Sequence, residues 1–166
     1  SVTKAPVLIT GEAGVGKRTL SKFIHENSSR AEKPFEMVDC STDGTTVENQ
    51  ILGWRDQEGR FNKGVLEKAN TGTVVFANID GLEDEFQKKL HKIISELEDY
   101  DIDIRIIATT TKNLSKLVGS GRFYRGLYTL VSNNTVALTP LRERAHDLEM
   151  MTRHFITEFA GGKNID

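Results

Sequence analysis

The segment GEAGVGKR, residues 11–18, constrains the fold of this chain more than any other feature. It fits the pattern G-x-x-x-x-G-K, whose glycines let successive backbone N–H groups curve around a phosphate. The apolar run PVLIT (residues 6–10) precedes it, and KRTLSKFIHENS (residues 17–28) follows with apolar residues at helical spacing. A buried strand, a glycine loop and a helix in this order predict a phosphate-binding loop within an α/β fold.

The predicted phosphate site comprises the loop and the start of the helix: Gly11, Glu12, Ala13, Gly14, Val15, Gly16, Lys17, Arg18 and Thr19. We expect Lys17 to reach the outer phosphates while the helix adds the positive end of its dipole. Arg18 stands where the general pattern has Ser or Thr, so it cannot coordinate Mg²⁺ as a hydroxyl would. Its charge can instead contact a phosphate or a neighbouring acid. The alternative interpretation is a loop that keeps its shape and has lost its ligand.

Short apolar runs alternate with amphipathic segments along the rest of the chain. We expect further strands at residues 35–40, 73–79 and 103–110 and within 131–141, and helices at 46–54, 64–70, 83–99 and 145–160. Residues 55–64 are interpreted as a polar loop. The apolar stripes of the two clearest helices are Leu20, Phe23 and Ile24, and Phe86, Leu90, Ile93, Ile94 and Leu97. Strands alternating with helices predict a parallel sheet with helices on both faces.

Composition limits the classes of protein to which the chain can belong. Its 166 residues suit one domain, and a net charge of −2 gives no general attraction to DNA or to an anionic membrane. Contact with DNA would therefore need a domain that is not in this chain. No apolar run is long enough to span a membrane, and the single Cys40 excludes an internal disulfide framework. We expect a cytoplasmic domain excised from a longer polypeptide.

Several segments together resemble the central AAA+ domain of bacterial enhancer-binding proteins of the NtrC type, the activators of sigma-54 RNA polymerase. These segments, in the family's order, are VLITGEAGVGK, IHENSSRAEKPFEMVDC, GVLEKANTGTVVF, DIRIIATTTKNL, GSGRFYRGLY and LTPLRERAHDL. The resemblance implies a P-loop NTPase core of α/β fold that takes ATP or ADP, with the helical lid largely absent here. It also implies self-oligomerisation, contact with RNA polymerase or a sigma factor, and a place in a transcription regulator such as a response regulator.

The resemblance also predicts two acidic residues that this chain lacks. The family places Asp-Glu at the end of the third strand, where the Asp holds the Mg²⁺ shell and the Glu polarises the attacking water. Here the pair is Ala77 and Asn78. Asp80 follows two residues later, and on a strand it would share a face with Asn78, so it is a candidate substitute. We expect Mg²⁺ binding to be weak or absent.

Two further family positions that act on the nucleotide differ in this chain. Thr111 stands at the sensor position after the fourth strand, where most relatives have asparagine. The two arginines that reach the neighbouring subunit's nucleotide are replaced by Tyr124 and Leu130. Arg125, displaced by one residue, and Arg122 are candidate substitutes. An arginine finger is worth about 10³ to 10⁵ in rate in other nucleotide hydrolases, so its loss predicts little turnover.

The segments that contact sigma-54 in the family are shortened here. GRFNKG (residues 59–64) is interpreted as a remnant of the main contact loop, with Phe61 matching its aromatic residue and Asn62 replacing its threonine. The second loop has contracted to EDYDID (residues 98–103). We therefore do not expect sigma-54 remodelling. Trp54, before the shortened loop, is expected at a half-buried helix end, with a partner contact as the alternative.

The leading hypothesis is a degenerate NtrC-type domain that binds nucleotide and acts in oligomerisation and signal relay. One alternative is an active ATPase that uses Asp80 and Arg125 as displaced catalytic groups. Another is a receptor domain for a signalling nucleotide such as cyclic di-GMP. No metal site is inferred, because Cys40 and the four histidines do not share metal-ligand spacing: His25, His91, His146 and His154. His25 is interpreted as structural.

Overall fold

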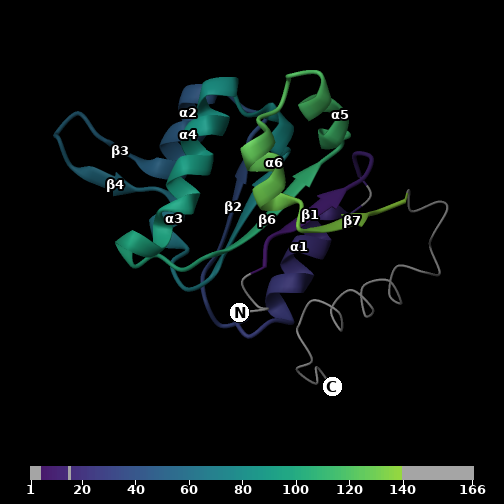
Figure 1. Cartoon of the computed structure of the whole chain (residues 1–166). Helices are drawn as coiled ribbons and strands as arrows, with labels where there is room; N and C mark the ends of the chain where they lie inside the picture. Colours follow the sequence, from purple (N-terminus) through teal and green to yellow (C-terminus); the bar gives the residue numbers. More distant parts are fainter. Residues whose placement is uncertain (1–4, 15, 140–166) are drawn as a thin grey trace.

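The computed structural model describes residues 5–14 and 16–139, in which one parallel sheet forms the centre (Figure 1). Its strands lie in the order β2 (Phe35–Asp39), β5 (Thr73–Ala77), β6 (Arg105–Thr110), β1 (Val7–Thr10) and β7 (Asn134–Ala137). Every neighbouring pair is parallel, so all carboxyl ends meet at one edge. The predicted parallel α/β sheet is confirmed, including the fifth strand within residues 131–141.

Helices cover both faces of this sheet, as predicted. On one face α1 (Lys17–Glu26) packs Leu20 and Ile24 against residues of β1, β5 and β6. The core on the opposite face includes residues from α2 (Gly44–Leu52), α3 (Val65–Lys68), α4 (Asp84–Ser95), α5 (Leu114–Gly119) and α6 (Arg125–Val131). Burial on both faces explains why β5 and β6 are almost continuously apolar.

The predicted apolar stripes are correct in part. In α1 the buried face consists of Lys17, Leu20, Ser21, Ile24 and His25, so Phe23 lies beside it and is 37% exposed. In α4 Phe86 and Leu90 are buried, and Ile93 and Ile94 are half-buried. Leu97 is buried but belongs to the following 3₁₀ turn η3 (Leu97–Tyr100), because α4 already ends at Ser95. The predicted helix over 83–99 is therefore two elements.

Residues 53–63 form a β-hairpin, which corrects the predicted polar loop. β3 (Gly53–Arg55) pairs antiparallel with β4 (Phe61–Lys63), and the hairpin extends away from the sheet (Figure 1). Asp56 holds the turn by accepting hydrogen bonds from the backbone N–H groups of Glu58 and Arg60. Trp54 consequently lies on a strand rather than at a helix end, and it is 47% exposed.

Two short helices, α5 and α6, were not expected from the sequence. Each presents only a narrow apolar face, with Leu114 buried in α5 and Leu127 and Val131 buried in α6. The Tyr124 N–H donates a 2.7 Å hydrogen bond to the Gln87 side chain, which attaches the α5–α6 connection to α4. The helix predicted over residues 145–160 lies outside the described residues.

Buried polar side chains join α1 to the amino edge of the sheet. His25 Nε2 donates to the Lys33 carbonyl at 3.1 Å, so Nδ1 accepts the Thr73 hydroxyl at 2.8 Å. Burial lowers the pKa of His25, which keeps the ring neutral at pH 7. Arg30 donates to the carbonyls of Thr71 and Gly72 and to the Asp103 carboxylate. The structural interpretation of His25 is confirmed.

Candidate nucleotide site

The predicted phosphate loop lies between β1 and α1 at the carboxyl edge of the sheet. Gly14 and Gly16 have φ angles of +81° and +95°, which residues with side chains rarely adopt. A Cβ at either position would meet no atom of the described residues within 4 Å, so backbone conformation rather than packing requires glycine there. Gly16 caps α1 without a side-chain hydrogen bond, so no capping side chain competes with an anion for the N–H groups of the first turn.

Lys17 is held inside this loop. Its side chain is mostly buried, and Nζ donates hydrogen bonds to the carbonyls of Gly11 at 2.9 Å and Glu12 at 2.7 Å. Burial lowers the pKa of Lys17, while the negative charge of Asp80 acts in the opposite direction. The loop therefore combines an ammonium group fixed by two carbonyls with open helix N–H groups, a combination that suits a phosphate.

The residues that flank the loop differ in their roles. Arg18 Nη2 lies 3.2 Å from Asp39 Oδ2, so it contacts a neighbouring acid, one of the two partners considered from the sequence. Thr19 is exposed on the first turn of α1, and Ala13 is exposed in the loop. Val15 lies outside the described residues.

β5 ends at Ala77, two residues earlier than predicted. Asn78 adopts the left-handed conformation with φ 55° and ψ 52°, and its N–H donates to the Thr109 hydroxyl at 3.2 Å. Its amide Nδ2 donates to Asp39 Oδ1 at 3.1 Å. Asp39 pairs with Ala77 in the β2–β5 register, so a carboxylate does lie beside the position of the missing acids. It comes from the neighbouring strand.

Asp39 was missed as a site residue, although an acid at the end of a strand beside a phosphate loop is a usable signal. The Ser41 hydroxyl donates to its Oδ1 at 2.6 Å and the Ser41 N–H at 3.0 Å. These bonds, together with Asn78 and Arg18, lower the pKa of Asp39 to about 2. The carboxylate is therefore ionised at neutral pH, and its oxygens are engaged by protein donors.

Asp80 lies on the 3₁₀ turn η2 (Ile79–Gly81), so the expectation that it shares a strand face with Asn78 is wrong. Strand alternation does not apply once β5 has ended. The Thr110 hydroxyl donates to Asp80 Oδ1 at 2.6 Å, and Thr110 is fully buried. Thr111, the residue predicted at the sensor position, is exposed. The hydroxyl that faces an acid of the site belongs to Thr110.

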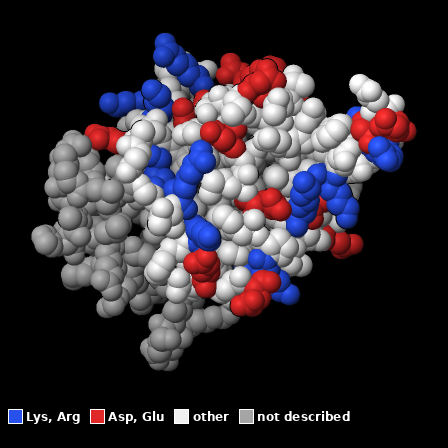
Figure 2. Space-filling model, turned by 180° about the vertical axis from the view of Figure 1, so that it is seen from behind, with Lys and Arg blue, Asp and Glu red and all other residues white. Residues whose placement is uncertain are grey.

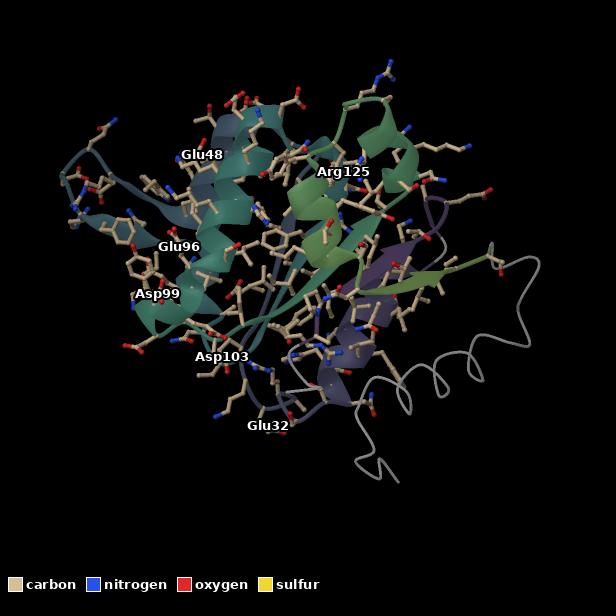
Figure 3. All side chains as sticks on the ribbon, in the orientation of Figure 1. Glu32, Glu48, Glu96, Asp99, Asp103 and Arg125 are labelled. Carbon is tan, nitrogen blue, oxygen red and sulfur yellow. The ribbon has the colours of Figure 1, made fainter. Side chains whose placement is uncertain are left out.

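The candidate trans-acting arginines lie on the α5–α6 connection and at the start of α6. Arg122 and Arg125 are both exposed, and within the described part of the chain neither makes an ion pair. Figure 3 places Arg125 at the end of α6 nearest to α5, away from Glu96 and Asp99. Leu130, at the second family arginine position, packs against the core and contributes no charge.

The residues present do not fit the Mg²⁺ centre that the family implies. Ala77 offers no ligand, and the Asp39 oxygens are occupied by Ser41, Asn78 and Arg18. Over residues 5–14 and 16–139 no three acidic, histidine or cysteine side chains lie close enough together to hold a metal ion.

The charge on the surface is mixed. Figure 2 shows blue and red side chains interspersed over the face seen from behind, without an extended field of one sign. The described helices are all too short or too polar to cross a membrane. The surface in this view offers no broad basic footprint for DNA.

Comparisons with known proteins identify the family. The family described as "Sigma-54 interaction domain" matches residues 1–141. The chain belongs to this family. It is an NtrC-type AAA+ domain with the P-loop NTPase fold, as the resemblance implied.

Curated relatives and solved structures agree with this assignment. The sigma-54 interaction domain is 34% identical to a Nif-specific regulatory protein of Azospirillum brasilense over 95% of this chain and 27% of that protein. It is 32% identical to the regulatory protein AtoC of Escherichia coli over 100% of this chain and 39% of that protein. NtrX from Brucella abortus is similar in structure, with a TM-score of 0.80 and 25% identity over 96% of this chain and 39% of that chain. The chain thus spans well under half of these proteins.

Proposed function

We propose that this sigma-54 interaction domain binds ATP or ADP at the phosphate loop and is impaired in hydrolysis. The geometry of the loop carries the proposal: Lys17 is fixed inside it, and α1 begins without a side-chain cap. NtrX structures described as complexes with ATP and with ADP share the fold, with TM-scores of 0.76 for both. These likenesses, at 24% identity, support the fold, and the loop residues support the ligand.

The impairment follows from which groups can accept a proton from water. A general base must hold a free acceptor within hydrogen-bond reach of the attacking water. The Asn78 amide donates to Asp39, and a neutral amide takes up a proton poorly. Asp39 has a pKa of about 2, so it is a weak base as well as an occupied one. In this proposal neither Asn78 nor Asp39 activates water, and the phosphate loop binds and orients phosphates without them.

The wider role that we propose is oligomerisation and signal relay within a transcription regulator. Family membership supports this role, and DNA contact would come from a domain that is not in this chain. Contact with RNA polymerase or a sigma factor also belongs to the proposal, but sigma-54 remodelling does not. The β3–β4 hairpin is short, and residues 97–100 form a 3₁₀ turn where relatives have a second loop.

Calorimetry with ATP and ADP, with and without Mg²⁺, tests binding, and release of inorganic phosphate tests turnover. We expect saturable binding that depends little on Mg²⁺ and that weakens at least about 100-fold in Lys17→Ala. Lys92→Ala is a matched control, because Lys92 is an exposed lysine on α4. ATP turnover that Lys17→Ala abolishes would contradict impairment, and equal affinities for wild type and Lys17→Ala would contradict binding at the loop.

One observation favours the alternative of an active ATPase. Asp80 is held by the Thr110 hydroxyl, and its charge acts on Lys17, so a carboxylate does lie near the phosphate loop. If Asp80 and the exposed Arg125 replace the family groups, Asp80→Asn and Arg125→Ala should each remove ATP turnover. For a pure binding module neither change alters phosphate release, which distinguishes the two functions in one assay.

A further inference from the structure

A second polar pocket lies next to the phosphate loop but does not include Lys17. It has a volume of about 610 Å³ and is bounded by the end of β2, by α2 and by the β3–β4 hairpin. Its charged and aromatic lining consists of Arg18, Asp39, Trp54, Lys63 and Lys68. Pockets of roughly 300 to 1,000 Å³ accommodate small ligands of nucleotide size.

The charge of this lining is positive although the whole chain has a net charge of −2. Asp39 is paired with Arg18, so Lys63 and Lys68 are the charges of the pocket lining that remain without an ion pair. Within the part of the chain that the structure describes, neither Lys63 nor Lys68 makes an ion pair. Two unneutralised ammonium groups at one concave surface attract an anion, because concave walls concentrate the field.

The remaining lining supplies neutral hydrogen-bonding groups and one flat ring. β2 is the edge strand of the sheet, and the Cys40 N–H donates to Ala77 on β5. Because alternate backbone groups of a strand point to opposite sides, the Met37 N–H and carbonyl face the open edge. Thr46 also lines the pocket, with its hydroxyl donating to Asp43 at 3.3 Å, and the half-exposed indole of Trp54 offers a stacking surface.

We propose that this pocket binds a phosphorylated small molecule with a flat ring, separately from the phosphate loop. Lys63 and Lys68 contact the phosphate, and Trp54 stacks on the ring. Arg18 lies between the two sites, because it follows Lys17 in α1 and lines the pocket. The inference goes beyond the proposed function, since it does not require nucleotide at the loop.

The experiment uses the full chain in a Lys17→Ala background, which removes the phosphate-loop site. Inorganic pyrophosphate, ADP and cyclic di-GMP are titrated separately and followed by calorimetry and by tryptophan emission. Trp54 is the single tryptophan, so a change in emission reports on this pocket. We expect saturable binding of a phosphorylated probe with a dissociation constant below about 1 mM, with the ring-bearing probes tighter than pyrophosphate.

Matched variants assign the site. Lys63→Ala and Lys68→Ala should each weaken binding about tenfold in this background, and Trp54→Ala should remove the preference for a ring. Lys92→Ala, on α4, should leave affinity unchanged. Absence of saturable binding for all three probes would overturn the proposal, as would binding that survives the combined loss of Lys63 and Lys68. If instead the phosphate loop binds no nucleotide, wild type and Lys17→Ala have equal affinity for every probe, which distinguishes this failure from the failure of the pocket.

Discussion

The amide of Asn78 donates a 3.1 Å hydrogen bond to the carboxylate of Asp39, across the carboxyl ends of neighbouring strands β5 and β2. The family pattern places its two carboxylates at the end of β5, where this chain has Ala77 followed by Asn78. In this chain the negative charge beside that strand end lies on β2, where Arg18 and Ser41 also bind it. Both oxygens of Asp39 are therefore engaged by protein donors at this end of the strand.

The first prediction concerns this amide–carboxylate contact. Asn78→Glu replaces a donor to Asp39 with a second carboxylate, so we expect the free energy of unfolding to fall by about 2 kcal/mol at pH 7. Adding Asp39→Asn should recover part of that loss, because it removes the like charge but also the ion pair with Arg18, while the introduced glutamate keeps the left-handed backbone. Urea denaturation of the three variants measures both changes. Equal stability of wild type and Asn78→Glu would show that the contact contributes nothing.

The second prediction concerns the Arg18–Asp39 ion pair. The two side chains are 58% and 35% exposed, so solvent screens their attraction. A double-mutant cycle with Arg18→Ala and Asp39→Asn should give a coupling free energy of about 0.5 kcal/mol, decreasing at about 1 M salt. A coupling that salt does not change would instead indicate that the pair acts through packing. The cycle is measured by urea denaturation at low and high salt.

The third prediction is a pH dependence that arises from His25. Its pKa in the folded protein is lowered by burial, so the unfolded chain binds the proton more readily. The contribution of His25 to the free energy of unfolding is complete above the ordinary histidine pKa of about 6.5 and decreases as the pH falls below it. We expect His25→Gln to flatten the decrease in the free energy of unfolding between neutral and mildly acidic pH. His91→Gln, on the half-buried side of α4, is the control.

The fourth prediction compares two buried arginines. Arg105 is 2% exposed, and burial lowers its pKa to about 10. Among residues 5–14 and 16–139, its Nε and one terminal nitrogen have no hydrogen-bond partner. Arg30 is also buried but donates to the carbonyls of Thr71, Gly72 and Asp103 and to the Asp103 carboxylate. Arg105→Met should raise the free energy of unfolding by about 1–3 kcal/mol, because it removes an uncompensated buried charge.

Arg30→Met is the matched variant and should have the opposite sign. It removes the Arg30 donor from the Thr71 carbonyl and one of the two donors to the Gly72 carbonyl, which keeps the Arg105 N–H, so we expect a loss of about 3 kcal/mol. Thermal or urea denaturation of both variants gives the comparison. Destabilisation by Arg105→Met of the same size as Arg30→Met would mean that the Arg105 guanidinium has a binding partner in solution.

Local patterns in the sequence were sufficient for the parallel sheet and the phosphate loop. The apolar run before Gly11 and the glycines at 14 and 16 are local features, and each meets its physical requirement within a few neighbouring residues. The hairpin at residues 53–63 was not predictable in this way. Its strands are short, and their pairing depends on Asp56 holding a turn between them.

The nucleotide site shows the same division between local and long-range information. The sequence by itself determined that Ala77 and Asn78 are neutral and that Lys17 follows a glycine loop. Only the tertiary structure decided that Asp39 stands beside Asn78 and that Asp80 binds Thr110 rather than sharing a strand face with Asn78. The physical reason is that strand order and strand ends set these contacts. Asp39 and Asn78 are far apart in the chain and meet because β2 pairs with β5, and Asp80 turns toward Thr110 because β5 ends at Ala77.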